Sequence, residues 1–257
     1  MNLPIYVLTV DKDGGQRKVH CSATFERLNL TPTFVQGFLL NNPQLTQEYS
    51  SWRNLLFAKR SLSAQEISVY MGHRKIWAQI VAGQNEVAFV AEDDLSIVDA
   101  TAFLHVIDNA GDHKAWDILK LFDFAPKKIV ASHDWHGLKI VDYKYPASST
   151  VAYLITREAA RRLLQRKRFY RPVDEDVSWS WEFDLRVRSV SPNIVGEVSD
   201  KLGGSLIEDS RLALRQHKNR LRSIVGIFWT LVKQIRARRH LRRILTNTAS
   251  FPDQPAR

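Results

Sequence analysis

Three consecutive carboxylates, Glu92, Asp93 and Asp94, follow a short apolar run at residues 87–91, and this placement constrains the fold of the chain strongly. The run is rich in β-branched and aromatic residues and is typical of a buried strand. Carboxylates at the end of a buried strand repel one another and lose hydration unless a cation compensates them. Mg²⁺ and Mn²⁺ prefer oxygen ligands and share substrate phosphates. The triplet therefore predicts a metal–diphosphate site, and a solvated acidic turn is the alternative.

The sequence also predicts a helix immediately before this strand. Ser63 is followed three residues later by Glu66, which is the pattern of a capping box at a helix N-terminus. Apolar and aromatic residues then recur at roughly helical spacing as far as Trp77. Gly83 separates this expected helix, residues 63–81, from the strand.

This order of helix, loop, strand and acidic triplet resembles glycosyltransferase family 25. In that family a helix of the form L-(S/T)-x-x-E-(I/V)-x-x-x-x-(S/G)-H-x-x-x-W precedes an apolar strand that ends in E-D-D. Residues 149–164 are similar to a further strand–helix segment of the family, and residues 171–177 to its P-(V/I)-D segment. The resemblance covers about residues 5–198. The positions that match in the first segment are Leu62, Ser63, Glu66, Ile67, Gly72, His73, Trp77, Glu92, Asp93 and Asp94.

The alternation of strands and helices along the chain predicts an α/β fold with a mostly parallel sheet covered by helices on both faces. The resemblance implies a GT-A-like, Rossmann-type arrangement of that sheet. We expect a glycosyltransferase domain at residues 1–209 and a basic helical tail at residues 210–257. The chain shows a polar stretch at residues 41–53 that we expect to be a loop, and residues 185–190 are expected to form the last core strand.

The resemblance implies a metal-dependent hexosyltransferase that moves a sugar, galactose in much of the family, from a UDP-sugar to a saccharide acceptor with inversion. Lipopolysaccharide or lipooligosaccharide core is the implied acceptor. Asp94 is the first candidate metal ligand for Mn²⁺ or Mg²⁺ and Asp93 the alternate, while Glu92 holds the ribose or the neighbouring sugar. At the N-terminus the chain keeps Asp11 and Arg17 as donor contacts.

His73 and Trp77 lie one helical turn apart on one face of the expected helix. Their match to the family implies a role in the donor pocket. A histidine on a helix is also commonly a hydrogen-bonded packing residue, so packing is the competing interpretation.

A carboxylate base for the acceptor hydroxyl is expected within residues 172–184, where acids alternate with aromatic residues. Asp174 is the first candidate because it matches the P-(V/I)-D position, and Asp176 is the second. Asp174 as a helix cap is the structural alternative. Trp179 and Trp181 are candidates for stacking on a sugar ring, and packing in the core is the alternative for both.

Basic charge is concentrated at the C-terminus. Of 37 Lys and Arg residues, twelve follow residue 210, together with one acid, Asp253. Residues 211–243 contain no acid, and apolar residues such as Phe228, Leu231 and Ile235 recur there every three or four positions. A basic amphipathic helix of this kind suits an anionic membrane surface. Packing on the catalytic domain and binding of nucleic acid are the two alternatives.

A location in the cytoplasm, peripheral on the inner face of the membrane, follows as an expectation. The single cysteine, Cys21, excludes an intrachain disulfide and fits a reducing compartment. No apolar run approaches the length of a membrane span, and the N-terminus lacks the pattern of a signal peptide. A catalytically inactive, membrane-associated scaffold with the same fold is the rival function.

Overall fold

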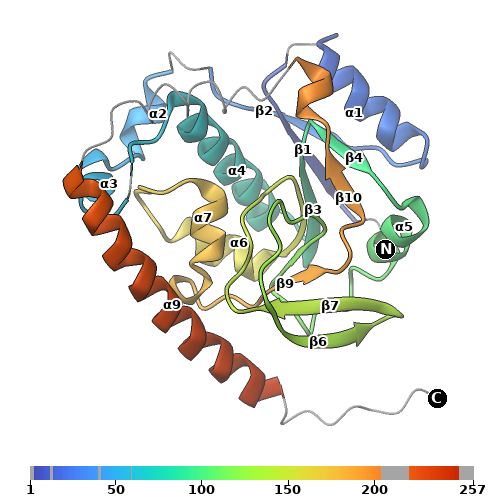
Figure 1. Ribbon diagram of the computed structural model, residues 1–257. Helices are drawn as coiled ribbons and strands as arrows, with labels where there is room; N and C mark the ends of the chain where they lie inside the picture. Colours follow the sequence, from blue (N-terminus) through green and yellow to red (C-terminus); the bar gives the residue numbers. More distant parts are fainter. Residues whose placement is uncertain (1–2, 12–13, 40–41, 59, 204–219, 249–257) are drawn as a thin grey trace.

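A sheet of eight strands organises the part of the chain that the computed structural model describes, which is residues 3–11, 14–39, 42–58, 60–203 and 220–248 (Figure 1). The strand order is β2-β1-β3-β8-β5-β9-β7-β6. A second sheet pairs β4 (Leu95–Ile97) with β10 (Val195–Glu197). The large sheet is built from β1 (Ile5–Thr9), β2 (Thr33–Gln36), β3 (Val87–Glu92), β5 (Ile118–Lys120), β6 (Ile129–Trp135), β7 (Leu138–Tyr143), β8 (Ala152–Thr156) and β9 (Val187–Val190).

The large sheet is mixed, although six of its eight strands point in one direction. Only β8 and β7 run the other way, so that β8 is antiparallel to both of its neighbours, β3 and β5. The predicted mostly parallel sheet is thus correct for the direction of most strands. It is wrong for the pairs that β8 and β7 form, which are antiparallel. Between β5 and β8 the chain forms the β6–β7 hairpin in place of a crossover helix, so β5 and β8 are not joined as a parallel β–α–β unit.

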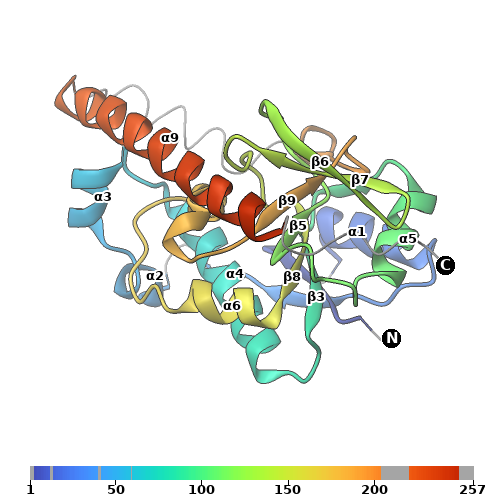
Figure 2. The same cartoon turned by 90° about the horizontal axis from the view of Figure 1, so that it is seen from below.

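Helices cover both faces of the sheet, as the alternating pattern predicts (Figure 2). Successive side chains of a strand point to opposite faces. In β3, Phe89 and Ala91 pack with one set of helices, α1 (Gln16–Glu26) and α5 (Ala100–Asp108). Ala88 and Val90 face the other set, which is α4 (Ala64–Ala82), α6 (Arg157–Leu164) and α7 (Val173–Ser178).

The predicted helix before β3 is confirmed together with its cap. The Ser63 hydroxyl accepts a hydrogen bond from the Glu66 amide at 3.1 Å, and the Glu66 carboxylate accepts one from the Ser63 amide at 3.0 Å. The helix ends at Gly83. Gly72 faces β1, where a Cβ atom would lie 2.4 Å from a terminal methyl group of Leu8, so glycine lets α4 approach the sheet closely.

Two expectations about the element order are wrong. The stretch expected to be a loop contains two short helices, α2 (Gln44–Gln47) and α3 (Ser51–Phe57). Tertiary contacts hold α3, because the buried Asn54 amide donates to the Tyr170 carbonyl oxygen at 2.8 Å. The core also continues past β9 into β10, which is preceded by the buried Ile194.

Two 3₁₀ turns, η1 (Ser180–Glu182) and η2 (Ser199–Leu202), and the long helix α9 (Arg220–Thr248) complete the described elements. Part of α9 packs on the domain: the Trp229 indole donates to the Leu56 carbonyl oxygen at 3.1 Å, and His240 lies 2.9 Å from the Leu185 carbonyl oxygen. The packing alternative for the tail is therefore confirmed for α9. Residues 211–219 lie outside the described residues.

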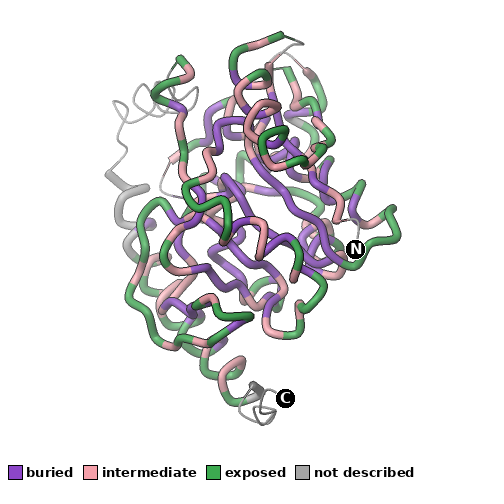
Figure 3. The backbone as a smooth tube through the Cα atoms, turned by 90° about the vertical axis from the view of Figure 1, so that its right-hand side faces the viewer, coloured by how far each residue is buried: buried purple, intermediate pink, exposed green. Residues whose placement is uncertain are grey.

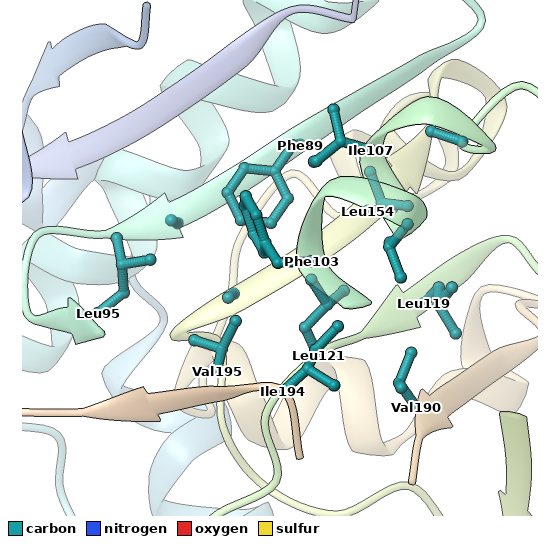
Figure 4. Close-up of a cluster of buried hydrophobic side chains, with 14 of the residues drawn as sticks. Phe89, Leu95, Phe103, Ile107, Leu119, Leu121, Leu154, Val190, Ile194 and Val195 are labelled. Carbon is teal, nitrogen blue, oxygen red and sulfur yellow. The ribbon is translucent and has the colours of Figure 1, made fainter. Parts of the chain in front are cut away.

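Buried residues concentrate in the strands and on the helix sides that face them (Figure 3). On the α1/α5 face, the fully buried Phe89 makes edge contacts with Phe25 and Phe103, with ring centroids 6.3 and 5.4 Å apart. Figure 4 shows Phe89 beside Phe103. These aromatic contacts fix β3, which carries the acidic triplet.

Removing the Phe89 ring should leave a cavity between β3 and both helices. We expect Phe89→Ala to lower the free energy of unfolding by about 3–5 kcal/mol, measured by urea denaturation. The matched control is Phe124→Ala, because the Phe124 side chain is 74% exposed. Equal losses in the two variants would contradict this account of the core.

Candidate active site

The acidic triplet divides between the two faces of the sheet at the point where β3 ends at Glu92 and a turn begins. Glu92 follows Ala88 and Val90 and turns toward α4, where it meets His73. Asp93 turns to the opposite face and meets Arg17 of α1. Asp94, beside Asp93 in the turn, also meets Arg17, so the division separates Glu92 from the Asp93–Asp94 pair.

On the α1 side, one guanidinium serves two carboxylates. Arg17 Nη1 lies 3.2 Å from Asp93 Oδ1 and 3.0 Å from Asp94 Oδ2, and all three side chains are almost fully buried. The Thr9 hydroxyl donates to Asp93 Oδ2 at 2.7 Å. Thr9 and Arg17 reach the triplet because β1 and β3 are parallel neighbours that end at the same edge. These contacts bring together three of the residues expected at the donor site.

Asp11 shapes the turn that leads into α1. Its carboxylate accepts a hydrogen bond from the Arg17 amide at 2.8 Å, and its own amide donates to the Thr9 hydroxyl at 3.1 Å. A Cβ atom at Gly15 would collide with the Asp11 carboxylate at 2.4 Å. Asp11 thus orients the start of the helix that delivers Arg17.

On the α4 side, a buried hydrogen-bond chain ends at Glu92. The Trp77 indole donates to the Tyr153 hydroxyl at 3.0 Å, and that hydroxyl lies 2.9 Å from His73 Nδ1. His73 Nε2 lies 3.3 Å from Glu92 Oε1, and the Thr150 hydroxyl donates to the same oxygen at 2.7 Å. His73 and Trp77 are 0% exposed, so they act on the site by orienting Glu92.

The pKa values follow from burial and from these partners. Burial, followed by the charge of Glu92, raises the pKa of Asp94 to about 7. Burial also raises the pKa of Asp93, against the opposing effects of Thr9 and Arg17. For Glu92, burial is outweighed by hydrogen bonding and charge from His73 and by the Thr150 hydroxyl, so its pKa is lowered. Asp94 is therefore the carboxylate whose charge is least compensated.

Asp94 Oδ1 is buried and has no hydrogen-bond partner. An unpartnered anionic oxygen beside Asp93 is a suitable ligand for a hard divalent cation. Within the described ranges no three His, Cys, Asp or Glu side chains are arranged to hold a metal ion. A Mg²⁺ or Mn²⁺ bound by one or two carboxylates and completed by substrate phosphates fits these residues, whereas an all-protein cage does not.

The two candidate bases occupy different environments in α7. Asp176 is fully buried: it accepts a hydrogen bond from the Tyr70 hydroxyl at 2.6 Å and forms ion pairs with Arg166 and Arg171, both at 3.1 Å. Asp174 in the first turn of the helix is only partly buried. Of the two carboxylates, Asp174 is the one with access to solvent.

The two candidate tryptophans are packed together, with ring centroids 5.0 Å apart. Trp179 is 5% exposed, with the Arg171 guanidinium 3.9 Å from its ring centroid on one side and Trp229 of α9 nearby. Trp181 is more exposed than Trp179. A stacked sugar needs a free ring face, which the surroundings of Trp179 do not offer.

The sequence analysis did not single out several polar residues at the same sheet edge. Lys120 at the end of β5 donates to Asp123 at 2.6 Å, and both are buried. Glu197 of β10 contributes to the raised pKa of Asp94, behind burial, Glu92 and the opposing Arg17. Asp123 could have been found from the sequence, because it is an acidic residue that closely follows a predicted strand, as the triplet does. Glu197 had no signal, because β10 was not expected.

An α/β sheet with buried carboxylates at the carboxyl ends of neighbouring strands defines a class of protein whose ligand site lies at that edge. Comparison with known families makes the assignment specific. Residues 2–178 match the model of glycosyltransferase family 25 (LPS biosynthesis protein), which is more than half of the chain. The chain belongs to glycosyltransferase family 25.

Two curated relatives show similarity over part of the chain. One is a glycosyltransferase 25 family member from Aedes aegypti, 30% identical over 128 residues, which are 46% of this chain and 20% of the relative. The other is a probable inactive glycosyltransferase 25 family member 3 from Rattus norvegicus, 29% identical over 126 residues, 46% of this chain and 22% of the relative. The aligned part spans about a fifth of the length of the curated relatives it matches.

The raised pKa of Asp94 predicts how the metal-free protein responds to pH. The carboxyl gains its charge near pH 7 when folded and near pH 4 when unfolded, so the unfolded state binds fewer protons between these values. Asp94 therefore lowers stability as pH rises from about 4 to about 7. We expect Asp94→Asn to raise the free energy of unfolding at pH 8 by on the order of a few kcal/mol, measured by urea denaturation without divalent ions.

Asp93→Asn is the matched control, because Asp93 has partners on both oxygens and its replacement should bring no comparable gain. Adding Mn²⁺ should raise the melting temperature of the wild-type protein more than that of Asp94→Asn. If the wild-type protein is as stable at pH 8 as Asp94→Asn, the buried charge of Asp94 does not destabilise the fold and this account is wrong.

Proposed function

We propose that this chain transfers a sugar, galactose being the first candidate, from a UDP-sugar to a saccharide acceptor with inversion. The observation that supports it most is the pair Asp93–Asp94, buried at the shared edge of β1 and β3 with Asp94 Oδ1 unpartnered. Two buried carboxylates beside the partly buried Glu92 are costly in an unliganded fold. A cation and a diphosphate would remove that cost, which fits the family to which the chain belongs.

The donor would lie along the carboxyl ends of β1, β2 and β3. A cleft of about 510 Å³ beside the end of β2 is our candidate for the nucleoside. Asp11 and Arg17, which follow the neighbouring strand β1, would face the diphosphate. Glu92, held by His73 and Thr150, would accept hydrogen bonds from the ribose or sugar hydroxyls. The cleft is lined by Gln36, Gly37, Phe38, Leu39, Asn42, Pro43 and Lys75.

Asp94, with Asp93 as alternate, would hold Mn²⁺ or Mg²⁺, which supplies Lewis acidity toward the diphosphate leaving group when bound. Arg17 contributes a fixed positive charge at the same place. Its guanidinium can stabilise the negative charge that grows on the phosphate as the glycosidic bond breaks, because the guanidinium is already in position before the donor binds. The GT-A arrangement remains part of this proposal, supported by the strand directions around β3.

Asp174 is our candidate for the base that removes the acceptor proton, because it reaches solvent whereas Asp176 is occupied by two arginines. Glu175 beside it has a pKa raised by burial, against the opposing charge of Lys233 of α9. Trp181 is our candidate for contact with the acceptor sugar. The acidic and aromatic composition of this segment suits a saccharide more than a nucleic acid.

The acceptor that we propose is a lipid-linked saccharide such as a lipopolysaccharide or lipooligosaccharide core, met at the inner face of the cytoplasmic membrane. The family description names lipopolysaccharide biosynthesis. The single, buried Cys21 suits a reducing compartment. Among the described helices none is long and apolar enough to cross a membrane, so attachment would be peripheral.

An inactive scaffold is the second candidate function, because one curated relative is described as probably inactive. The two candidates differ in what Asp94 does. An active transferase needs a bound donor at Asp94, whereas a scaffold needs only the fold.

A panel of nucleotide sugars distinguishes them. We expect manganese-dependent hydrolysis of one UDP-sugar, with UDP-galactose first, and loss of that activity in Asp94→Asn by at least about 10²-fold. Calorimetry of donor binding on the same samples gives a second readout. If no nucleotide sugar is bound or hydrolysed by the folded wild-type chain, the scaffold is the correct function.

The two candidate bases give opposite patterns on amide substitution. Asp174→Asn should lower kcat by roughly 10²–10⁴ with an unchanged melting temperature. Asp176→Asn should lower the free energy of unfolding by about 3–5 kcal/mol, because it leaves Arg166 and the buried Arg171 with Glu182 as the one carboxylate that pairs with both. Steady-state kinetics and thermal unfolding of both variants test this. An active, stable Asp174→Asn enzyme would exclude Asp174 as the base.

A further inference from the structure

The long helix α9 contacts the domain through one stripe of residues. Gly226, Ala237 and His240 are buried, and Lys233 lies over the Tyr145 ring at 5.3 Å. These positions recur every three or four residues and therefore lie on one side of the helix. None of them belongs to the apolar stripe predicted from the sequence. The helix docks on the domain by the side that carries these residues and Trp229.

The apolar stripe of α9 faces outward instead. Phe228, Leu231 and Ile235 are 58, 55 and 53% exposed, at a spacing of three and four residues. A helix that packs on a domain normally buries such a stripe, because each large apolar side chain left in water forgoes its burial energy. Its outward position leaves a strip of apolar surface available.

A second set of exposed apolar side chains lies beside it, on α3. Trp52, Leu55 and Leu56 are each more than half exposed. The two helices are side by side at the N-terminal half of α9 (Figures 1 and 2), where the Phe57 ring meets Trp229 at 5.0 Å. Among the described residues, twelve large apolar side chains are strongly exposed, and six of them are on these two helices.

The outer side of α9 changes from apolar to basic along its length. Arg238, Arg239 and Arg242 continue the same side after Ile235 and are exposed. On α3, Arg53 is exposed beside Trp52, 5.3 Å from its ring centroid. Neither described helix contains an acidic residue. Apolar and cationic side chains thus share one surface without a counter-charge on either helix.

We propose that α3 and α9 together form the surface by which this protein binds an anionic lipid bilayer, with the six apolar side chains entering the interface and the arginines contacting lipid headgroups. Apolar burial and attraction to anionic lipid add in such a surface. The inference deepens the peripheral membrane location proposed above by naming its contact residues. It does not depend on the identity of the donor or on catalysis.

The composition of the surface favours a bilayer over its two competitors. A second copy of the chain bound symmetrically through this face would bring like-charged arginines together, which is unfavourable. A nucleic acid would pair with the arginines but would leave the aliphatic residues of α3 and α9 without a partner. An anionic bilayer satisfies both halves of the surface.

Vesicle sedimentation of the full-length chain tests the proposal. We expect binding to phosphatidylcholine vesicles that contain phosphatidylglycerol, weaker binding at high salt, and little binding to phosphatidylcholine alone. The double variants Leu231→Ser/Ile235→Ser and Trp52→Ser/Leu55→Ser should each bind at least about tenfold more weakly, a loss of about 1.4 kcal/mol. Arg239→Gln/Arg242→Gln should weaken binding to the anionic vesicles alone.

Val98→Ser is the matched control, because Val98 is 68% exposed but follows β4, far from both helices in Figure 1. It should bind vesicles like the wild type. Circular dichroism and thermal unfolding establish that each variant is folded. UDP-sugar binding measured on the same samples separates the two proposals, since a wild-type chain that binds the donor but does not bind anionic vesicles overturns the surface alone.

A spectroscopic readout tests α3 independently. Brominated anionic lipids should quench part of the tryptophan emission, and Trp52→Phe should remove that part while leaving vesicle binding nearly intact. Three results would overturn the proposal: an α3 double variant that binds vesicles like the wild type, self-association in the absence of lipid that the same substitutions abolish, or retention on DNA with none on anionic vesicles.

Discussion

The compensation of two buried carboxylates and the partly buried Glu92 by groups from separate elements determines how this domain is put together. Arg17 arrives from α1 and serves Asp93 and Asp94, and His73 arrives from α4 and serves Glu92. Each partner depends on the alternation of side chains along β3 and on the helices that cover its two faces. Without these partners, the acidic end of β3 would carry a desolvation cost comparable to the stability of a whole domain.

Helix α4 connects the two halves of the candidate site. Tyr70 and His73, one turn apart, reach Asp176 of α7 and Glu92 of β3, respectively. The stacking of Tyr70 on Phe169, with centroids 3.9 Å apart, fixes the first of these contacts. A movement of α4 would therefore disturb the donor side and the acceptor side together, which explains how buried residues without ligand contact can matter for transfer.

The sequence predicted local features well because their causes are local. The capping box at Ser63 and the buried strand before the triplet each depend on residues within a few positions. The reversal of β8, the partner choice of Arg17 and the burial of Asp176 depend on residues far apart in the chain. The P-(V/I)-D match placed Asp174 first, but no local pattern showed that Asp176 is buried, since Tyr70, which donates a hydrogen bond to it, comes from α4.

The tail shows why amphipathic pattern alone does not decide what a helix contacts. The pattern identified the apolar stripe correctly, and it was natural to assign that stripe either to the domain or to a membrane. The structure uses the opposite side of α9, with Ala237 and His240, for the domain. Docking by the side that carries Ala237 and His240 leaves the stripe of Phe228, Leu231 and Ile235 exposed. Packing on the domain and binding of a surface are therefore not exclusive alternatives for this helix. Because Trp229 also packs against Trp179, beside the acid-rich segment of α7, whatever the outer side of α9 binds would be held close to the proposed acceptor side of the site.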